Sequence, residues 1–285
     1  MTERSDLSGQ FIKVYSPEPH VVVVQLARNP VNAFHEPFWV EYGHVFDKIG
    51  QDPTVRVVVL ASTLPKVFSA GIDFTALGAL QTFDKDPARR ALQTRSFTMA
   101  FQEAIGATER CVYPVIAAVH GVALGLSIDI IAACDVRYAA DDTRFSIKEV
   151  DVGLAADIGT LARLPKLAGN QSLVHELAYT ARDFSASEAE RMGLVSRVVS
   201  GGRDGVLKIA LETAHIIALK SPIAVLGTKR TLQHARDHTV QENLEYVATW
   251  NSAMLQSSDL TVALKAAKAK QLAIFEPLGK SIAKL

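Results

Sequence analysis

The chain has 285 residues, of which 48% are hydrophobic and 21% are charged, a composition normal for one large globular domain or two small ones. Its 30 basic and 30 acidic side chains cancel, so the net charge gives no electrostatic case for binding nucleic acid or an anionic membrane surface. No apolar run approaches the roughly 18 residues of a membrane-spanning helix. The two cysteines, Cys111 and Cys134, form neither a CxxC pair nor a disulfide framework.

The first part of the chain predicts strands that alternate with helices. Residues 11–15 alternate apolar and polar side chains, and the β-branched run at 21–26 is typical of a strand. Helical spacing follows over 34–50, and the run at 55–62 is apolar enough for a strand buried on both faces. Further expected elements are a helix at about 88–110 and strands at 115–120, 136–140 and 145–147. This alternation predicts an α/β layered domain.

From about residue 200 the pattern becomes helical. Four helices are expected, at residues 206–219, 224–237, 239–256 and 260–275. We therefore divide the chain into a core, residues 1–200, and a helical C-terminal region, residues 201–285, that serves as a cap or an assembly surface.

Three acidic residues lie inside one mostly apolar stretch: Asp129, Glu149 and Asp157. Removing a carboxylate from water is costly, so such residues usually have a partner or a purpose. Carboxylates gathered in one apolar site push their pKa values apart, which proton-transfer chemistry can use. These three residues are the candidate catalytic groups.

Two glycine-containing turns follow the third and fourth expected strands, at residues 68–74 and 120–129. Such turns can leave backbone N–H groups free, and two of them could aim two donors at one oxygen, as in an oxyanion hole. On spacing alone, ordinary strand-to-helix turns remain the favoured interpretation. The sequence has no GxGxxG, GxxxxGK[ST], HExxH or GxSxG motif, so we expect neither a nucleotide cofactor nor a metal.

These turns, the strand pattern and the helical C-terminus resemble the crotonase (enoyl-CoA hydratase/isomerase) superfamily over roughly residues 10–275. Residues 148–166, 169–173 and 246–256 closely resemble one branch, the Δ3,5-Δ2,4-dienoyl-CoA isomerases. The resemblance implies a ββα spiral core with a helical C-terminal trimerisation region. It also implies conversion of a 3,5-dienoyl-CoA to a 2,4-dienoyl-CoA in β-oxidation of unsaturated fatty acids.

The acidic trio separates the branches of that superfamily. Hydratases carry two glutamates, at positions matching Asp129 and Glu149, and usually have glycine at the position of Asp157. The dienoyl isomerases are similar to this chain in having acids at all three positions. The resemblance implies that Asp157 removes a proton from C2 and that Glu149 protonates C6. For Asp129 three roles stay open: tuning the other two by like-charge repulsion, holding polar contacts in the pocket, or simply being paired inside the core.

The resemblance also implies an oxyanion hole made by the backbone N–H groups of Ile72 and Leu126. The surrounding substrate-binding residues would be Ala70, Gly71, Ile72, Asp73, Phe74 and Leu126. One position departs from the family pattern, because Leu126 stands where the second donor is usually a glycine. Leucine can serve if its φ is ordinary, whereas a positive φ would strain it.

The remaining expectations concern partners. The phosphates of coenzyme A need basic side chains, for which the candidates are Arg28, Lys66, Lys265, Lys268 and Lys270. The resemblance implies a homotrimer or homohexamer. The final residues, Ala283-Lys284-Leu285, are a close variant of a peroxisomal address, which predicts an import receptor as partner and the peroxisomal matrix as location. Two alternatives stay open: an enoyl-CoA hydratase, and an inactive family member that binds acyl-CoA.

Overall fold

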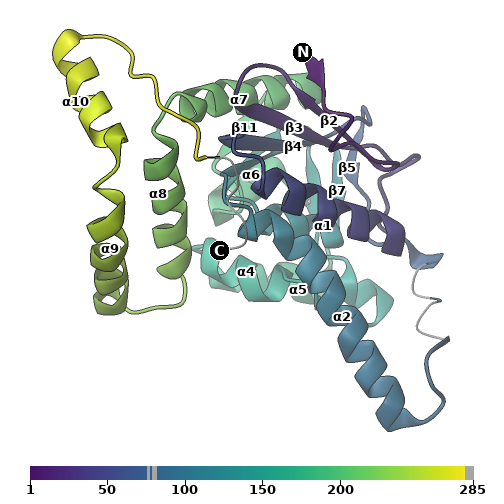
Figure 1. Ribbon diagram of the computed structural model, residues 1–285. Coiled ribbons are helices and arrows are strands. Elements are labelled where there is room, and N and C mark those ends of the chain that lie inside the picture. The colour runs from purple at the N-terminus through teal and green to yellow at the C-terminus, as the bar shows by residue number, and fades with distance from the viewer. Residues whose placement is uncertain (76–77, 79–81, 280–285) are drawn as a thin grey trace.

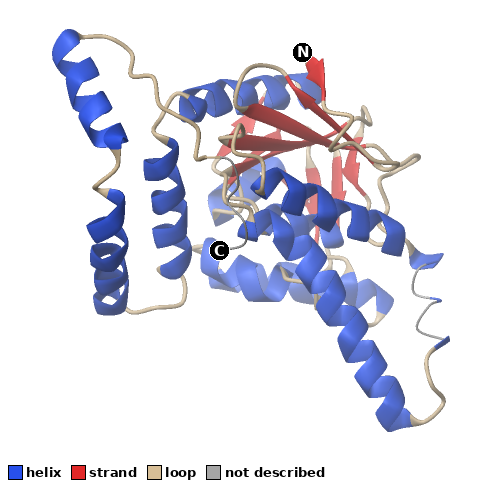
Figure 2. Ribbon diagram, in the orientation of Figure 1, coloured by secondary structure: helices blue, strands red, loops and turns tan. Residues whose placement is uncertain are grey.

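The computed structural model describes residues 1–75, 78 and 82–279 of the chain. Two sheets form its centre (Figure 2), and the α/β layering expected from the sequence is confirmed. The larger sheet has seven strands in the order β1-β2-β3-β4-β6-β8-β11, and the smaller has four in the order β10-β9-β7-β5. The strands are β1 Thr2–Glu3, β2 Ile12–Ser16, β3 Val21–Leu26, β4 Val57–Ser62, β5 Val67–Ser69, β6 Val115–Val119, β7 Val122–Leu124, β8 Val136–Ala140, β9 Arg144–Ser146, β10 Phe184–Ser185 and β11 Arg197–Val199.

Strands β3, β4, β6 and β8 pair in parallel at the middle of the larger sheet. Both faces of this sheet are buried, which is why its strands read as continuous apolar runs. On β3, Val22 and Val24 belong to one hydrophobic cluster, whereas Val21 and Val23 belong to a second cluster on the opposite face. Side chains of a strand point alternately to its two faces, so both halves of the run have a layer to pack against.

The helices cover these faces. They are α1 Glu36–Gly50, α2 Pro87–Arg110, α3 Leu126–Ala132, α4 Thr160–Leu167, α5 Gln171–Thr180, α6 Ala186–Met192, α7 Gly202–Ala218, α8 Pro222–His234, α9 Val240–Met254 and α10 Ser258–Ala269, with a 3-10 helix, η2, at Glu149–Val152. Helix α7 packs its small side chains Ala210, Ala214 and Ala218 on the second cluster. The predicted division at residue 200 stays a prediction, and the helix that directly follows it covers the sheet.

Helices α8, α9 and α10 stand to one side of the layered core (Figure 1). The expected helix at 260–275 is too long, because α10 ends at Ala269. Lys270 adopts the left-handed conformation with φ 53° and caps the helix, and Pro277 follows shortly after. From there the chain returns toward the core, where Arg56 donates a hydrogen bond to the carbonyl of Phe275 at 2.6 Å.

Within the described residues, no single helix is long and apolar enough to cross a membrane. The bent pair α7 and α8 together meets that test by length and composition only.

Candidate active site

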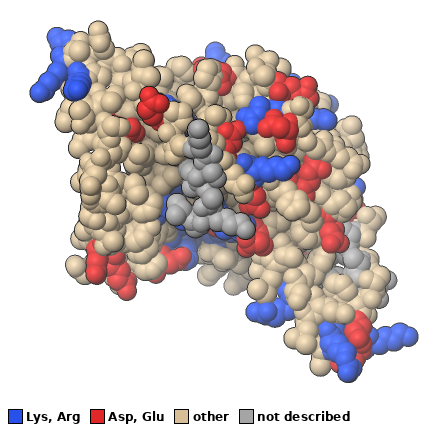
Figure 3. All heavy atoms as spheres, in the orientation of Figure 1, with Lys and Arg blue, Asp and Glu red and all other residues tan. Residues whose placement is uncertain are grey.

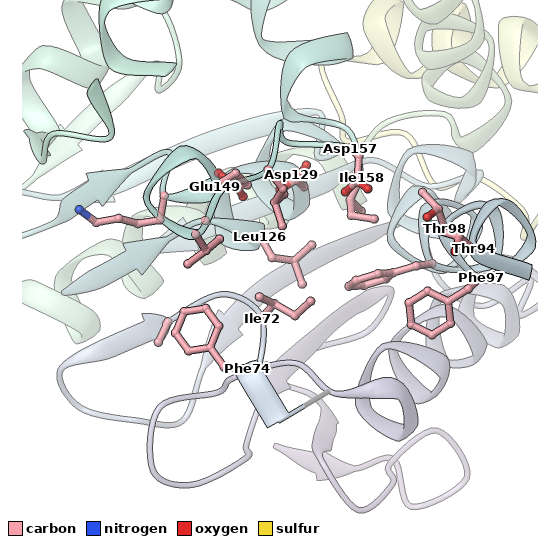
Figure 4. A pocket seen from close by; sticks show the side chains of 16 residues that line it. Ile72, Phe74, Thr94, Phe97, Thr98, Leu126, Asp129, Glu149, Asp157 and Ile158 are labelled. Atoms are coloured by element: carbon pink, nitrogen blue, oxygen red, sulfur yellow. The ribbon is translucent and has the colours of Figure 1, made fainter. Parts of the chain in front are cut away.

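A pocket opens where α2, α3 and η2 meet the turn that follows β5 (Figure 4). Its cavity has a volume of about 160 Å³ and is partly open to solvent. Its lining residues are Ala70, Ile72, Phe74, Thr94, Phe97, Thr98, Phe101, Gly125, Leu126, Asp129, Lys148, Glu149, Val152, Leu154, Asp157 and Ile158. The pocket therefore brings the three acids of the sequence together with both glycine turns.

The first turn places Ile72 on the pocket wall. Gly71 has φ +93°, and a Cβ at this position would lie 2.8 Å from the carbonyl oxygen of Leu124 and 3.4 Å from the amide nitrogen of Leu126. Only glycine lets the two turns approach this closely. The hydroxyl of Ser127 donates to the carbonyl of Ser69 at 2.7 Å and ties the turns together.

The second turn leads from β7 through Gly125, with φ 51°, into the first turn of α3. Leu126 is the first residue of that helix and is not among the described residues with positive φ. The positive φ that would strain a leucine is therefore found at Gly125, and Leu126 has the ordinary backbone conformation of a helical residue. Neither the Ile72 nor the Leu126 N–H donates to a residue that the structure describes. Two residues whose N–H groups have no described acceptor thus line the same pocket, an arrangement compatible with an oxyanion hole.

Asp129 is the most buried of the three acids, with 1% of its surface exposed. It lies on α3, and its Oδ1 accepts a hydrogen bond of 2.6 Å from the N–H of Thr160, where α4 begins. Burial, together with the charge of Glu149, raises the pKa of Asp129 to about 7, although the Thr160 hydrogen bond opposes the shift. Near neutral pH this carboxyl can therefore exchange its proton.

Glu149 is half-buried at the start of η2. A Cβ on Gly125 would lie 3.4 Å from its Oε1, so this carboxylate is beside the second oxyanion donor. Its Oε2 is buried and has no hydrogen-bond partner within the described chain. Burial raises the pKa of Glu149, and the charge of Asp157 adds to that rise. An acceptor left unpaired in a pocket is available for a substrate proton.

Asp157 lies in the loop between η2 and α4 and is exposed at the edge of the pocket. Partial burial of its carboxyl by the pocket wall raises its pKa. Its backbone carbonyl accepts a hydrogen bond of 2.6 Å from Nε2 of Gln102 on α2. In Figure 4, Glu149 and Asp157 lie on either side of Asp129, with Ile72 and Leu126 across the pocket from them.

Of the remaining predicted substrate-binding residues, two line the pocket and two do not. Ala70 and Phe74 line the pocket, whereas Gly71 and Asp73 do not. The carboxylate of Asp73 instead accepts hydrogen bonds from Thr75 and forms an ion pair of 2.8 Å with Arg28, and these contacts, with Thr75 first, hold its pKa below the usual value. Asp73 therefore supports the turn rather than the substrate.

The basic candidates for coenzyme A are not gathered at the pocket. Arg28 is engaged by Asp73, and Lys66 is exposed. Lys265, Lys268 and Lys270 belong to α10 and its end, away from the pocket in this chain (Figure 1). Lys148 does line the pocket, and it also bonds the carbonyl of Ala181 at 2.9 Å.

Sequence reasoning missed one wall of the site, contributed by α2. Thr94, Phe97, Thr98 and Phe101 line the pocket from this helix. Their spacing of three, four and seven residues puts them on one helical face, and that pattern was readable once the helix at 88–110 had been assigned. Across the described ranges, no group of three or more His, Cys, Asp or Glu side chains could hold a metal ion.

Comparison with known proteins agrees with this geometry. The family model described as "Enoyl-CoA hydratase/isomerase" matches residues 17–275. The chain is 48% identical over 267 residues to the human mitochondrial Delta(3,5)-Delta(2,4)-dienoyl-CoA isomerase, covering 93% of this chain and 81% of that protein. It is 43% identical over 251 residues to the peroxisomal protein of the same name from Arabidopsis thaliana, covering 87% and 89%.

A solved structure of an enoyl-CoA hydratase from Bacillus anthracis superposes with a TM-score of 0.84 at 28% identity, covering 93% of this chain and 99% of that one. This likeness confirms the expected crotonase-like arrangement of core and C-terminal helices. With the family model spanning nearly all of the described core and relatives at almost half identity, the chain belongs to the enoyl-CoA hydratase/isomerase family.

Proposed function

We propose that the protein isomerises 3,5-dienoyl-CoA thioesters to 2,4-dienoyl-CoA thioesters. The observation that carries the proposal is the third acid: Asp157 shares one pocket with Glu149 and with the two free N–H groups. Addition of water to a 2-enoyl thioester does not require an acidic residue so far along the acyl chain. Moving two double bonds requires one proton to be removed from C2 and another to be added at C6. The relatives that are 43–48% identical and carry the dienoyl isomerase name support the same reaction.

The reaction would begin with the thioester oxygen between the N–H groups of Ile72 and Leu126. Negative charge develops on this oxygen when a proton leaves C2, and two preorganised donors stabilise it. The apolar wall of the pocket excludes water and strengthens these hydrogen bonds. The reaction moves protons only, so it needs neither a redox cofactor nor a metal.

Glu149 is the better placed base for C2. Its Oε1 is next to Gly125, the residue that precedes the Leu126 donor, and C2 is the atom bonded to the thioester carbonyl carbon. The C2–H bond breaks, the proton passes to Glu149, and the electron pair spreads over the dienolate. This assignment reverses the one expected from the sequence, which gave C2 to Asp157.

Asp157 then supplies the proton at C6. The new C6–H bond forms as the double bonds settle at C2–C3 and C4–C5 and the oxygen returns its charge to the carbonyl. Partial burial raises the pKa of Asp157, which favours its protonated form relative to a fully exposed aspartate. One turnover leaves Glu149 protonated and Asp157 charged, so before the next one Glu149 must release a proton to water once the product has left and Asp157 must take one up, for which its exposure gives access to solvent.

Asp129 supports the positions of Glu149 and Asp157. Its hydrogen bond with the Thr160 N–H fixes the start of α4, three residues after Asp157. The charge of Glu149 in turn raises the pKa of Asp129.

Assembly and location are further parts of the proposal. Exposed apolar side chains on α8 and α9, such as Leu232, Val240 and Leu244, support a homotrimer or homohexamer built through these helices. Figure 3 shows that the left side of the molecule, where these helices lie, is mostly uncharged between the basic side chains at its upper end and the acidic ones at its lower end. The location predicted from Ala283-Lys284-Leu285 falls outside the described residues; the Arabidopsis relative is named peroxisomal and the human one mitochondrial. Import through this tail would be lost on deleting the three residues from a fluorescent fusion.

The test incubates the purified protein with a 3,5-dienoyl-CoA and follows the ultraviolet absorbance of the conjugated 2,4-product. We expect turnover by the wild type and a loss of at least about 100-fold in Asp157→Asn, the usual contribution of a positioned acid or base. Hydration of a 2-enoyl-CoA without isomerisation would favour the hydratase alternative. Tight acyl-CoA binding without any turnover would favour the inactive one.

A further inference from the structure

The carboxylate of Asp157 has little that fixes it directly. It lies in a loop, it is exposed, and no other described residue donates a hydrogen bond to its side chain. Its position is therefore set by the backbone on which it stands. A catalytic group misplaced by about 1 Å can lose about 100-fold in rate, so whatever holds this backbone matters to the reaction.

Two hydrogen bonds hold that backbone. At one end, Nε2 of Gln102 donates to the carbonyl of Asp157 at 2.6 Å. At the other, the Thr160 N–H donates to Asp129 at 2.6 Å. The second bond is buried in the core, whereas the first comes from an exposed side chain that reaches across from α2. Without Gln102 the loop keeps its Thr160 end and the packing of Ile158 against the core, but the carbonyl of Asp157 itself loses its hydrogen bond.

Gln102 continues the ridge of α2 that lines the pocket. It follows Thr94 and Thr98 at intervals of four residues, so the three side chains project from the same side of the helix. Thr94 and Thr98 contact the pocket, and Gln102 lies one turn further along, beyond its wall. The helix that borders the acyl chain thus also carries the donor that holds Asp157.

We propose that Gln102 is a positioning residue that sets the carboxyl of Asp157 for proton delivery to C6. The inference rests on the proposed function and adds to it a residue that touches neither substrate nor reacting atoms. In the step concerned, the Asp157 O–H bond breaks and the C6–H bond forms, while Gln102 keeps its own protons throughout.

The test separates the two proton transfers. Wild type, Gln102→Met and Asp157→Asn are incubated with a 3,5-dienoyl-CoA in D2O, and exchange at C2 and formation of the 2,4-product are both measured. Methionine matches glutamine in length and helix propensity but cannot donate. Gln93→Met is the matched control. Gln93 lies on the same helix, but its Oε1 accepts a hydrogen bond of 2.7 Å from the N–H of Asp84 rather than bonding the Asp157 loop.

We expect Gln102→Met to slow product formation by about tenfold, with KM close to that of the wild type and C2 exchange largely kept. Like Asp157→Asn, but to a smaller extent, it should lower product formation while keeping C2 exchange. Gln102→Glu, which sets a carboxylate against the carbonyl of Asp157, should lower product formation more than Gln102→Met does. The proposal is overturned if Gln102→Met behaves like Gln93→Met, or if it alters a different partial reaction from Asp157→Asn. Failure of the proposed function is distinct, because then the wild type itself forms no 2,4-product.

Discussion

Replacing Gly71 by alanine tests the close approach of the two glycine turns. The new Cβ would stand 2.8 Å from the carbonyl oxygen of Leu124, a backbone atom that cannot swing away as a side chain would. The φ of +93° adds a strain of about 1–2 kcal/mol for any residue with a Cβ. Relief of the contact must move one turn away from the other, which separates the Ile72 and Leu126 donors. Loss of one such donor costs about 100- to 1000-fold in kcat.

The assay follows formation of the 2,4-dienoyl product and, in parallel, thermal unfolding of the variant. Gly193→Ala is the control, because Gly193 has a nearly equal φ of +91° while the nearest atom, the carbonyl oxygen of Leu167, would lie 3.3 Å from the new Cβ. We expect the control to lose stability by about 1–2 kcal/mol and keep its kcat, while Gly71→Ala loses both. Equal kcat values for the two variants would refute the account of the oxyanion hole.

Two further predictions concern the same helix, α3. Leu126→Gly keeps the backbone donor, so kcat should stay near the wild-type value, while the lost buried side chain destabilises the protein by roughly 2–5 kcal/mol in chemical denaturation; a collapse of kcat in folded protein would show that the side chain itself is needed. Burial raises the pKa of Asp129 from 3.8 to about 7, so the unfolded chain binds fewer protons between these values and stability falls as pH rises through them. At about 1.4 kcal/mol per pKa unit the loss is at most roughly 4 kcal/mol. Asp129→Asn should remove it, and an unchanged pH dependence of urea unfolding would contradict this origin.

Much of the fold could be predicted because local patterns determine it. The run Val21–Leu26 predicted a strand, and the structure divides its valines between two clusters on opposite faces. The helix at 88–110 matches α2 to within a residue. Helices α3 to α6 were missed, since all four have ten residues or fewer, fold against the core and carry no long amphipathic pattern of their own.

The membership of the site was also readable, whereas its internal geometry was not. Asp129, Glu149 and Asp157 could be identified from the sequence because a charged side chain in an apolar stretch is costly to remove from water. The neighbour of each acid is remote in sequence: Asp129 bonds a residue 31 positions away, and Asp157 one 55 positions away. No local pattern encodes such pairs, so the roles assigned to Asp157 and Glu149 from the sequence could be reconsidered only once Glu149 was located beside Gly125.

The three acids differ most in their access to water, and this difference gives each a separate task. Asp129 is buried, so a lasting charge there is costly and its carboxyl is best used as a hydrogen-bonded support. Glu149 is half-buried beside the oxyanion donors, where a carboxylate with a raised pKa can take a proton from carbon and hold it. Asp157 is at the rim, where it can recover a proton from solvent after each turnover. A third acid on a surface loop leaves the packing of the core unchanged. In the proposed mechanism, the same family fold would therefore gain transfer of a proton to C6 through one loop residue, Asp157, and the glutamine that bonds its backbone.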